Sequence, residues 1–310
     1  MRVFTAGPND AGRRVDAFFI RLLPTAPKSL IYKYMRTGKI KVSGKKPAPA
    51  DRLLEGDEIK YFGDESFLKE ETPRTPAPAS SVQVLCEDEN IALLVKPVCL
   101  ASQPDKLHTK DTLVDRFLWY LYQKGEFRPG GEHGFTPALC NRLDFNTQGL
   151  VIGAKNLPAL RSMNEAIRKG LVRKLYLCRV EGVPSPREGE ITGALLKDTK
   201  TNKSQIHKEG KTARTRYRTL YHDGKTSLLE VELFSGRSHQ IRVHLASIGC
   251  PLIGDAKYGN GGQGQALCAY KIRFDFPPDG GVLDGLSGKT FVLPEGDRLP
   301  ILQKRSKHNE

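Results

Sequence analysis

Residues 140–155 read CNRLDFNTQGLVIGAK and place two opposite charges just before a stretch that the pattern predicts to be a buried strand. Arg142 and Asp144 stand two positions apart, and a Thr-Gln-Gly turn and an apolar run follow them. Buried strands exclude charged side chains unless the charges are paired or used, because removing a charge from water is costly. Two interpretations are open: a surface ion pair of small energetic value, or a carboxylate held in a cleft for chemistry.

The size and charge of the chain limit the number of domains and the class of binding partner. Its 310 residues leave room for about two domains and for a full hydrophobic core. The chain carries 49 Lys and Arg against 35 Asp and Glu, a formal charge of +14. This surplus favours a polyanionic partner, either nucleic acid or an anionic membrane. No apolar run approaches the ~20 residues of a membrane span, so we expect no membrane association.

The cysteines and the first residues indicate the compartment. The six cysteines are scattered, and no two form a Cys-x-x-Cys pair. That distribution is typical of reduced thiols and argues against a disulfide framework or a structural zinc site. The start, MRVFTAGPND, lacks the apolar core of a secretory signal. We therefore expect a cytoplasmic protein. The seven histidines form no His-Glu-x-x-His motif or close cluster, so no catalytic metal is expected.

The N-terminal part predicts a small helical module. Residues 14–23 carry apolar side chains at helical spacing, and Pro24 ends that helix. A second helix is predicted over residues 29–38, with Ser29 as its N-cap and Gly38 as its C-terminal stop.

A basic segment completes this module. Residues 39–46 alternate apolar and basic side chains into a Ser-Gly turn, and residues 58–62 predict a further short strand. Between Arg13 and Lys46 there are ten Lys and Arg against one acid, a surplus of nine. A solvated surface usually mixes its signs, so this surplus predicts binding to a phosphate backbone. The candidate RNA-binding residues here are Arg13, Arg14, Lys28, Lys33, Arg36, Lys39 and Lys45.

The composition then divides the chain. Residues 63–81 carry three prolines among small and charged residues, which predicts an extended linker. Residues 82–97, VQVLCEDENIALLVKP, predict a hairpin with its turn at residues 87–90. We therefore predict an RNA-binding domain over residues 1–62, a linker over 63–81 and a catalytic domain over 82–310.

Two further segments of the predicted catalytic domain allow more than one functional interpretation. From Lys197 to Arg218 eight Lys and Arg face two acids, which indicates a phosphate-positioning surface or a merely solvated hairpin. Residues 259–264, GNGGQG, match a dinucleotide-binding pattern, but a predicted strand follows them where a helix would be required. A nucleotide-dependent enzyme is therefore disfavoured.

The segment after residue 237 predicts a helix. Ser238 can cap it, Ile241, Leu245 and Ile248 provide its core positions, and Gly249 ends it. His239 and Arg242 stand three positions apart and would share a face. By periodicity alone this is an ordinary amphipathic helix.

Two resemblances to known families decide between these interpretations. Residues 13–46 resemble the small RNA-binding domain of the ribosomal protein S-four type, with its strand-turn-strand ending in Val-Ser-Gly-Lys. In the body, CNRLDFNTQGL (residues 140–150), RKLYLCRVEG (173–182) and LFSGRSHQIRVHLASIGCPLIGDAKYG (233–259) together resemble the RluA/RluC-type RNA pseudouridine synthases. Two positions depart from that pattern: Asn141 stands in place of a histidine and Gln148 in place of a serine.

The resemblance implies an α+β fold, in which a small helix-rich RNA-binding domain precedes a large domain with a mostly antiparallel mixed sheet and a central cleft. It implies that Asp144 is the catalytic carboxylate, that Arg242 pairs with it, and that Tyr176 stacks on the target uracil. It further implies that Arg142, Arg237 and His239 contact RNA and that Leu267 packs next to the active site. For Tyr176 and Leu267, ordinary core packing is the alternative.

The reaction implied is the isomerisation of uridine to pseudouridine. It transfers no group and changes no redox state, so no cofactor is expected. Large-subunit (23S) ribosomal RNA is the first candidate substrate and tRNA the second, and we expect a monomer. The target base must leave its helix before it can react. The alternative is a catalytically silent RNA-binding or ribosome-assembly protein, which only Asn141 and Gln148 favour.

Overall fold

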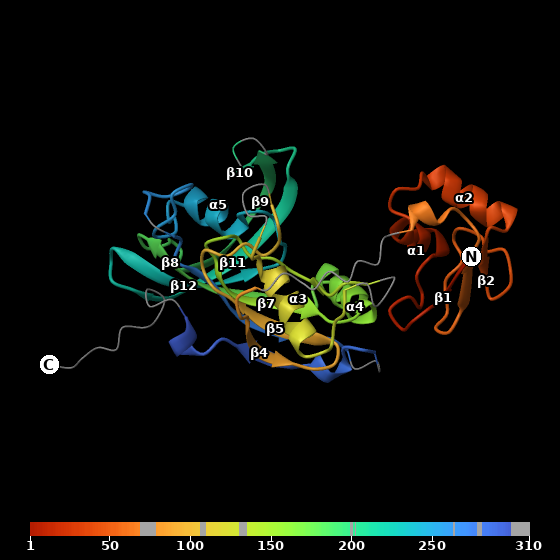
Figure 1. Cartoon of the computed structure of the whole chain (residues 1–310). Coiled ribbons are helices and arrows are strands. Elements are labelled where there is room, and N and C mark those ends of the chain that lie inside the picture. The colour runs from red at the N-terminus through yellow and green to blue at the C-terminus, as the bar shows by residue number, and fades with distance from the viewer. Residues whose placement is uncertain are drawn as a thin grey trace.

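The computed structural model describes residues 1–68, 79–105, 110–129, 135–198, 201, 203–262, 264–277 and 281–298. Within them the chain has the expected α+β fold. A small N-terminal module lies at one end of the molecule, beyond helix α4 (Leu157–Arg168) of the large body (Figure 1). Two hydrogen bonds join the parts: the Leu157 amide donates to Asn9 Oδ1 at 2.8 Å, and Arg161 Nη1 donates to the Ala11 carbonyl at 3.3 Å.

The N-terminal module combines two helices with a three-stranded antiparallel sheet of order β1-β3-β2. Phe18, Phe19, Ile31 and Met35 bury their side chains between the helices and this sheet. Phe67 and Leu68, past the predicted boundary at residue 62, also pack on this core. The elements are β1 (Arg2–Thr5), α1 (Val15–Leu22), α2 (Lys28–Thr37), β2 (Ile40–Val42), β3 (Glu58–Tyr61) and the 3-10 turn η1 (Glu65–Phe67).

The two helices of this module can be compared with the start and end residues predicted from the sequence. The helix over residues 14–23 and its end at Pro24 are confirmed, and Gly38 ends α2 in the left-handed conformation, φ 78°. Ser29 as N-cap is wrong: α2 begins at Lys28 after Pro27, with no side-chain cap. Proline fixes the backbone that enters the helix, which explains why the helix starts without a capping hydroxyl.

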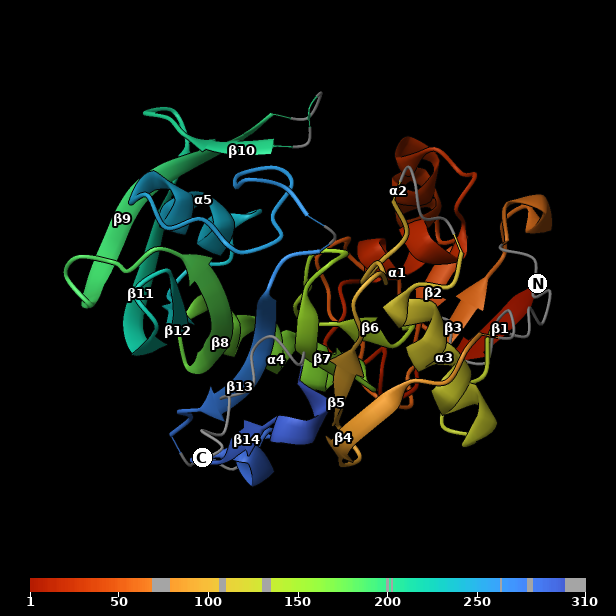
Figure 2. The ribbon, with the colours of Figure 1, turned by 90° about the vertical axis from the view of Figure 1, so that its left-hand side faces the viewer.

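The body is built on an 11-stranded sheet whose main order is β10-β9-β11-β12-β8-β13-β7-β5-β4. In the described part of the chain β13 and β7 pair in parallel, and the other strand pairs are antiparallel. The sheet is therefore mostly antiparallel and mixed, as predicted. Figure 2 shows β9 to β11 with helix α5 at one end and β4 with β5 at the other. The strands are β4 (Gln83–Glu87), β5 (Ile91–Lys96), β6 (Ala138–Leu139), β7 (Gln148–Ala154), β8 (Val172–Glu181), β9 (Glu188–Asp198), β10 (Lys203–Ile206), β11 (Lys211–His222), β12 (Thr226–Leu233), β13 (Leu267–Phe274) and β14 (Thr290–Val292).

Helices cover both faces of this sheet. The alternation of side chains along β5 sends Ile91, Leu93 and Val95 to one face, where α4 packs. Ala92 and Leu94 point to the other face, where α3 (Leu113–Gln123) and α5 (Gln240–Ser247) pack. The 3-10 turns η2 (Asp284–Leu286) and η3 (Glu295–Asp297) follow near the end of the described chain. The hairpin predicted at residues 82–97 is confirmed as β4 and β5.

Helix α5 differs in detail from the prediction. Ile241 and Leu245 are buried and the helix stops before Gly249 as expected, but Ile248 is 38% exposed and is not a core residue. Ser238 is not the cap, because the helix begins one residue later and His239 occupies the cap position. His239 has a left-handed backbone, φ 54°, a conformation that costs a non-glycine residue about 1–3 kcal/mol.

Candidate active site

A cleft of about 460 Å³ opens near the middle of the sheet, on the face that α5 covers. It is lined by the loop before β7, by β8, by the loop between β12 and α5, and by the start of β13. The structure thus brings together the predicted site residues of the body: Arg142, Asp144, Tyr176, Arg237, His239, Arg242 and Leu267, together with Asn141. The basic residues predicted in the N-terminal module do not line this cleft.

A larger hollow of about 700 Å³ lies on the opposite face of the sheet. Its lining includes Arg173 and Leu175, which alternate along β8 with the cleft residues Lys174 and Tyr176. The charges in this hollow are largely paired with one another, as in the 2.6 Å contact between Arg173 and Glu232. The smaller cleft, which holds the predicted site residues, is therefore the candidate active site.

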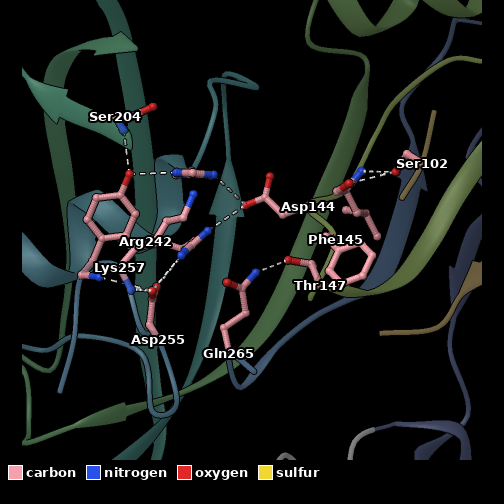
Figure 3. Close-up of polar contacts among 12 residues, drawn as sticks. Ser102, Asp144, Phe145, Thr147, Ser204, Arg242, Asp255, Lys257 and Gln265 are labelled. Carbon is pink, nitrogen blue, oxygen red and sulfur yellow. Dashed lines mark hydrogen bonds and ion pairs between the residues drawn. The ribbon is translucent and has the colours of Figure 1, made fainter. Parts of the chain in front are cut away.

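The loop that carries Asp144 is held at several backbone positions. The Asp144 carbonyl accepts the Thr147 amide at 3.0 Å, which closes a turn. On one side Ser102 Oγ donates to the Leu143 carbonyl at 2.8 Å and accepts the Leu143 amide at 3.0 Å. On the other, Gln265 Nε2 donates to Thr147 Oγ1 at 2.6 Å (Figure 3). These contacts hold the backbone on both sides of Asp144 in place.

Lys96 also holds the loop that carries Asp144. Its side chain is fully buried at the end of β5, and its ammonium donates to the carbonyls of Pro97 at 2.8 Å, Leu100 at 2.6 Å and Phe145 at 3.0 Å. Burial lowers the pKa of Lys96 to about 7, and the charge of Asp144 opposes this shift. Three carbonyl acceptors match the three protons of an ammonium group, so this geometry favours the charged form.

Gly149 allows the Asp144 loop to lie on β13. Ala269 pairs with Gly149 in the parallel ladder, and a Cβ at position 149 would lie 2.3 Å from the Ala269 carbonyl oxygen. Its φ of 129° also disfavours other residues. Glycine in the Thr-Gln-Gly sequence is therefore required by the close approach of two backbones directly after the site.

Two nitrogen groups face the Asp144 carboxylate, which is 34% exposed in the cleft. Arg242 Nη1 lies 3.4 Å and His239 Nε2 3.8 Å from the same oxygen, Oδ2. The predicted pairing of Asp144 with Arg242 is therefore present as a geometry, and the shared face of His239 and Arg242 points at the carboxylate.

Arg242 is itself oriented by Asp255. The Arg242 Nε and Nη2 atoms donate to the two Asp255 oxygens at 2.7 Å each, and both side chains are buried (Figure 3). Burial alone would raise the pKa of Asp255, but the hydrogen bonds and charge of Arg242, with the amides of Lys257 and Tyr258, outweigh it and lower that pKa. Asp255 thus remains charged and holds Arg242 in one orientation.

Tyr258 and Asp144 lie beside the two ring nitrogens of His239. The Tyr258 oxygen accepts the Ser204 amide at 2.6 Å and lies 2.8 Å from His239 Nδ1. Burial raises the pKa of Tyr258, so the hydroxyl keeps its proton and can donate it to Nδ1. Burial also lowers the pKa of His239 to about 4, against the charge of Asp144 and with the help of Arg242 and Lys257. A neutral His239 that accepts at Nδ1 carries its proton on Nε2, which faces Asp144.

Tyr176 and Leu267 form the apolar side of the cleft. Tyr176 is 6% exposed, and Leu267 is also buried. Burial, followed by the charge of Asp144, raises the pKa of Tyr176, so its hydroxyl stays protonated at neutral pH. At neutral pH the Tyr176 oxygen therefore cannot accept a proton as a phenolate anion. The aromatic ring remains suited to stacking on a nucleobase.

The two departures from the family pattern have structural partners away from Asp144. Asn141 Oδ1 accepts the Ile152 amide at 2.8 Å, which ties the loop to β7. Gln148 Nε2 donates to the Asp297 carbonyl at 2.9 Å. The features that favoured a silent protein thus leave the carboxylate and its donors undisturbed.

The predicted RNA-contacting arginines differ in their surroundings. Arg142 is exposed at the cleft and forms no hydrogen bond or ion pair within the described residues, so the surface ion pair with Asp144 is not formed. Arg237 is also exposed, and its Nε donates to the Thr212 carbonyl at 3.2 Å. In the N-terminal module the Arg13 side chain is only 12% exposed and lies 3.8 Å from Asp10. The other predicted residues there are exposed: Arg14, Lys28, Lys33, Arg36, Lys39 and Lys45.

The second basic run forms part of the hairpin strands β9 to β11. Arg214 lies 3.2 Å from Glu190, Arg216 3.7 Å from Glu232, and Arg218 3.0 Å from Glu230. Acids on neighbouring strands thus offset the charge of three of its eight basic residues, which the count along the sequence did not reveal.

Four residues that position the site were not predicted from the sequence. Lys96 carries a readable signal, because a lysine directly follows the apolar run of β5. Asp255 and Tyr258 lie inside the segment 233–259 that carried the resemblance, but only the fold brings them to Arg242 and His239. Ser102 offers no signal of its own.

Other predicted features can be located as well. The strand predicted after residues 259–264 is β13. In the described part of the chain no three His, Cys, Asp or Glu side chains gather in a way that could hold a metal ion. No helix there is long and apolar enough to cross a membrane, and all six cysteines are free.

Several known proteins are similar to this chain in sequence. The profile of the family described as RNA pseudouridylate synthase matches residues 90–247. An uncharacterized RNA pseudouridine synthase of Aquifex aeolicus is 31% identical over 284 residues, 86% of this chain and 87% of that protein. The ribosomal large subunit pseudouridine synthase D of Neisseria meningitidis serogroup A is 28% identical over 287 residues, 87% of this chain and 74% of that protein.

A solved structure agrees at the level of the fold. Human RNA pseudouridylate synthase domain containing 4 superposes with a TM-score of 0.56 at 19% identity, covering 71% of this chain and 89% of that one. The family profile spans the Asp144 loop, Tyr176 and Arg242, the residues that meet in the cleft. The chain therefore belongs to the RNA pseudouridylate synthase family.

Proposed function

We propose that this RNA pseudouridine synthase acts on large-subunit ribosomal RNA and uses Asp144 as its catalytic carboxylate. The observation that carries the assignment is the position of Asp144: a partly exposed carboxylate in the cleft, with Arg242 and His239 directed at one of its oxygens. A carboxylate in such a place is accessible to a ligand and faces two nitrogen groups that can bind it.

The reaction itself balances within one nucleotide. The bond between the anomeric carbon and uracil N1 breaks, the base turns, and a bond from the same carbon to C5 forms; C5 loses a proton and N1 gains one. Asp144 acts at the ribose, as nucleophile or as base. Arg242 and the Nε2–H of His239 hold its charge, while Tyr176 stacks on the detached uracil and Leu267 packs behind it. The cleft volume of about 460 Å³ suits a flipped nucleotide.

The N-terminal module supplies RNA affinity in this proposal, as a domain of the ribosomal protein S-four type. Its exposed Arg14, Lys28 and Lys33 are suited to phosphates, and Arg142 and Arg237 extend the contact to the cleft. The ribosomal substrate is inferred from relatives named as large-subunit synthases. We take the protein to be monomeric and cytoplasmic, and tRNA to be the second candidate substrate.

The test is nucleoside analysis of unmodified ribosomal RNA transcript after incubation with the pure protein and no added cofactor. Pseudouridine has the mass of uridine but a different retention. We expect it to appear with the intact chain and to vanish with Asp144→Asn, while RNA binding persists. Full activity of a folded Asp144→Asn variant would remove Asp144 from the mechanism, and modification of tRNA alone would overturn the ribosomal substrate.

A further inference from the structure

One lysine of the cleft has no partner in the protein. Lys174 belongs to β8, lines the cleft and lies two residues before Tyr176. Its side chain forms no hydrogen bond and no ion pair within the part of the chain that the structure describes. Burial lowers the pKa of its ammonium group, which shows that this group is shielded from water. An unpaired cation in such a place costs free energy, which indicates that a ligand completes the site.

Two other lysines of the large domain show how a buried ammonium group is accommodated when it serves the fold. Lys96 donates to three backbone carbonyls. The side chain of Lys155 is 8% exposed, and its Nζ lies 2.7 and 2.8 Å from two glutamate carboxylates. Both lysines therefore hold segments of the chain together, whereas the Lys174 side chain makes no polar contact within the described residues. Its position is better explained by what enters the cleft than by stability.

The geometry of β8 places Lys174 beside Tyr176. Side chains two residues apart on a strand point to the same face and start roughly 7 Å from each other. The residues that pair with Lys174 on the neighbouring strands are both apolar, Leu233 on β12 and Ile272 on β13. The lysine is therefore flanked by apolar side chains in the sheet, and its flexible stem can bring the ammonium group to the edge of a base that stacks on Tyr176.

The proposed reaction creates a negative charge at this point. When the bond between the anomeric carbon and N1 breaks, its electron pair stays with the uracil ring. The detached base therefore carries a negative charge, shared between its ring nitrogens and the carbonyl oxygens O2 and O4, until C5 uses an electron pair to bond to the same carbon. A preorganised donor directed at such an oxygen lowers the barrier, and a cation does so most strongly where water is excluded.

We propose that Lys174 is a further catalytic residue, whose ammonium group donates to a carbonyl oxygen of the target uracil and stabilises the charge of the detached base. The inference rests on the proposed function, including the stacking of uracil on Tyr176. It explains why no protein group neutralises Lys174, since the acceptor arrives with the substrate. A phosphate is the less suitable ligand, because it is strongly hydrated and the ammonium group is shielded from water. The exposed Arg142 and Arg237 of the cleft suit the phosphates instead.

The first experiment compares Lys174→Met, which keeps the length of the side chain, with Lys174→Arg, which keeps the charge. With ribosomal RNA transcript we expect kcat to fall roughly a hundredfold for Lys174→Met, with KM within about twofold of the wild-type value, and Lys174→Arg to retain more activity. Lys271→Met is the matched control and should keep the wild-type kcat, because Lys271 is a half-buried lysine of β13 that pairs with Glu230 outside the cleft. A wild-type kcat for Lys174→Met would overturn the proposal, and so would a raised KM with unchanged kcat, which indicates a phosphate contact.

Stability separates this role from a structural one. Replacing an unpaired and shielded ammonium group by an apolar side chain should not lower the urea concentration at the midpoint of unfolding. Lys271→Met loses the contact with Glu230 and should not raise that midpoint. A clear fall in the midpoint for Lys174→Met, with a normal kcat per folded molecule, would make Lys174 a structural residue.

A change in the substrate tests the contact itself. RNA fragments carry 2-thiouridine or 4-thiouridine at a position that the wild-type protein modifies, because sulfur accepts hydrogen bonds more weakly than oxygen. We expect the ratio of single-turnover rates between the wild type and Lys174→Met to be smaller with one of these two substrates than with uridine. Equal ratios for all three substrates would overturn the contact. If the wild-type protein makes no pseudouridine, the proposed function fails; if it does and Lys174→Met is equally fast, only the role of Lys174 fails.

Discussion

Arg242 is bound more closely to Asp255 than to Asp144. Two hydrogen bonds of 2.7 Å join it to Asp255, whereas its remaining Nη1 lies 3.4 Å from Asp144 (Figure 3). The buried pair therefore fixes the orientation of Arg242 and leaves one N–H edge for the carboxylate in the cleft. This arrangement makes Asp255 a positioning residue, although it does not line the cleft.

The first prediction concerns this pair. Asp255→Asn leaves Arg242 buried without its counter-charge, so we expect the free energy of unfolding to fall by about 3–5 kcal/mol and pseudouridine formation to decrease strongly. Urea unfolding and single-turnover rates measure the two effects. Asp275→Asn is the control, because it makes the same change in an ion pair whose Arg273 partner is half exposed and should cost less than about 1 kcal/mol. Equal losses in both variants would contradict the role of Asp255.

The second prediction concerns the tautomer of His239. Tyr258→Phe removes the hydroxyl 2.8 Å from Nδ1, which can donate to that nitrogen, so the ring can place its proton on either nitrogen. We expect kcat to fall by roughly tenfold, the effect of about 1.4 kcal/mol, with RNA affinity unchanged. Tyr217→Phe is the control, since it also removes a buried hydroxyl hydrogen bond, to the Pro186 carbonyl, outside the cleft. A fall in kcat of the same size in the control would indicate a general packing effect.

The third prediction concerns acid stability. The pKa of His239 is about 4 in the folded protein against 6.5 ordinarily. Between these values the unfolded chain binds a proton that the folded chain does not, so stability is lost as the pH falls through this window, by up to about 1.4 kcal/mol per pH unit. His239→Gln should flatten this dependence, measured by urea unfolding at several pH values. An unchanged slope would show that His239 is already protonated in the folded state.

The fourth prediction concerns the N-terminal module. Changing Lys28, Lys33 and Arg36 of α2 to alanine in the full chain removes three exposed charges beside the exposed Tyr32. If they contact phosphates, the plot of log affinity against log salt should flatten by roughly two to three units. The control changes Arg168 and Lys169, exposed at the end of α4, to alanine. If the slope changed only in the control variant, the RNA-binding surface would lie on the large domain and not on the N-terminal module.

The sequence predicts the site residues better than the contacts that position them. The ordered motifs predicted that Asp144, Tyr176 and Arg242 belong to one site, and the structure brings them into one cleft. Helix α1 was predicted because its apolar residues recur with helical spacing. Strand β1 could not be found from alternation, because its side chains are mostly exposed. Ser29 and Ser238 were wrong as caps for the same reason: a capping hydroxyl is one of several ways to start a helix, and Pro27 and His239 start these two. Asp255 and Tyr258 act across the fold, where spacing along the chain carries no information.

The fifth prediction tests Lys96 as the anchor of the catalytic loop. Lys96→Met keeps the length of the side chain but leaves the carbonyls of Leu100 and Phe145 without their donor in a buried place. Unsatisfied buried carbonyls should lower the free energy of unfolding by about 3 kcal/mol. Since Phe145 adjoins Asp144, pseudouridine formation should also fall in the fraction that stays folded. Lys169→Met, at an exposed lysine that caps the C-terminus of α4, is the control. If the folded Met variant retained the wild-type rate, the loop would hold Asp144 through Ser102 and Gln265 alone.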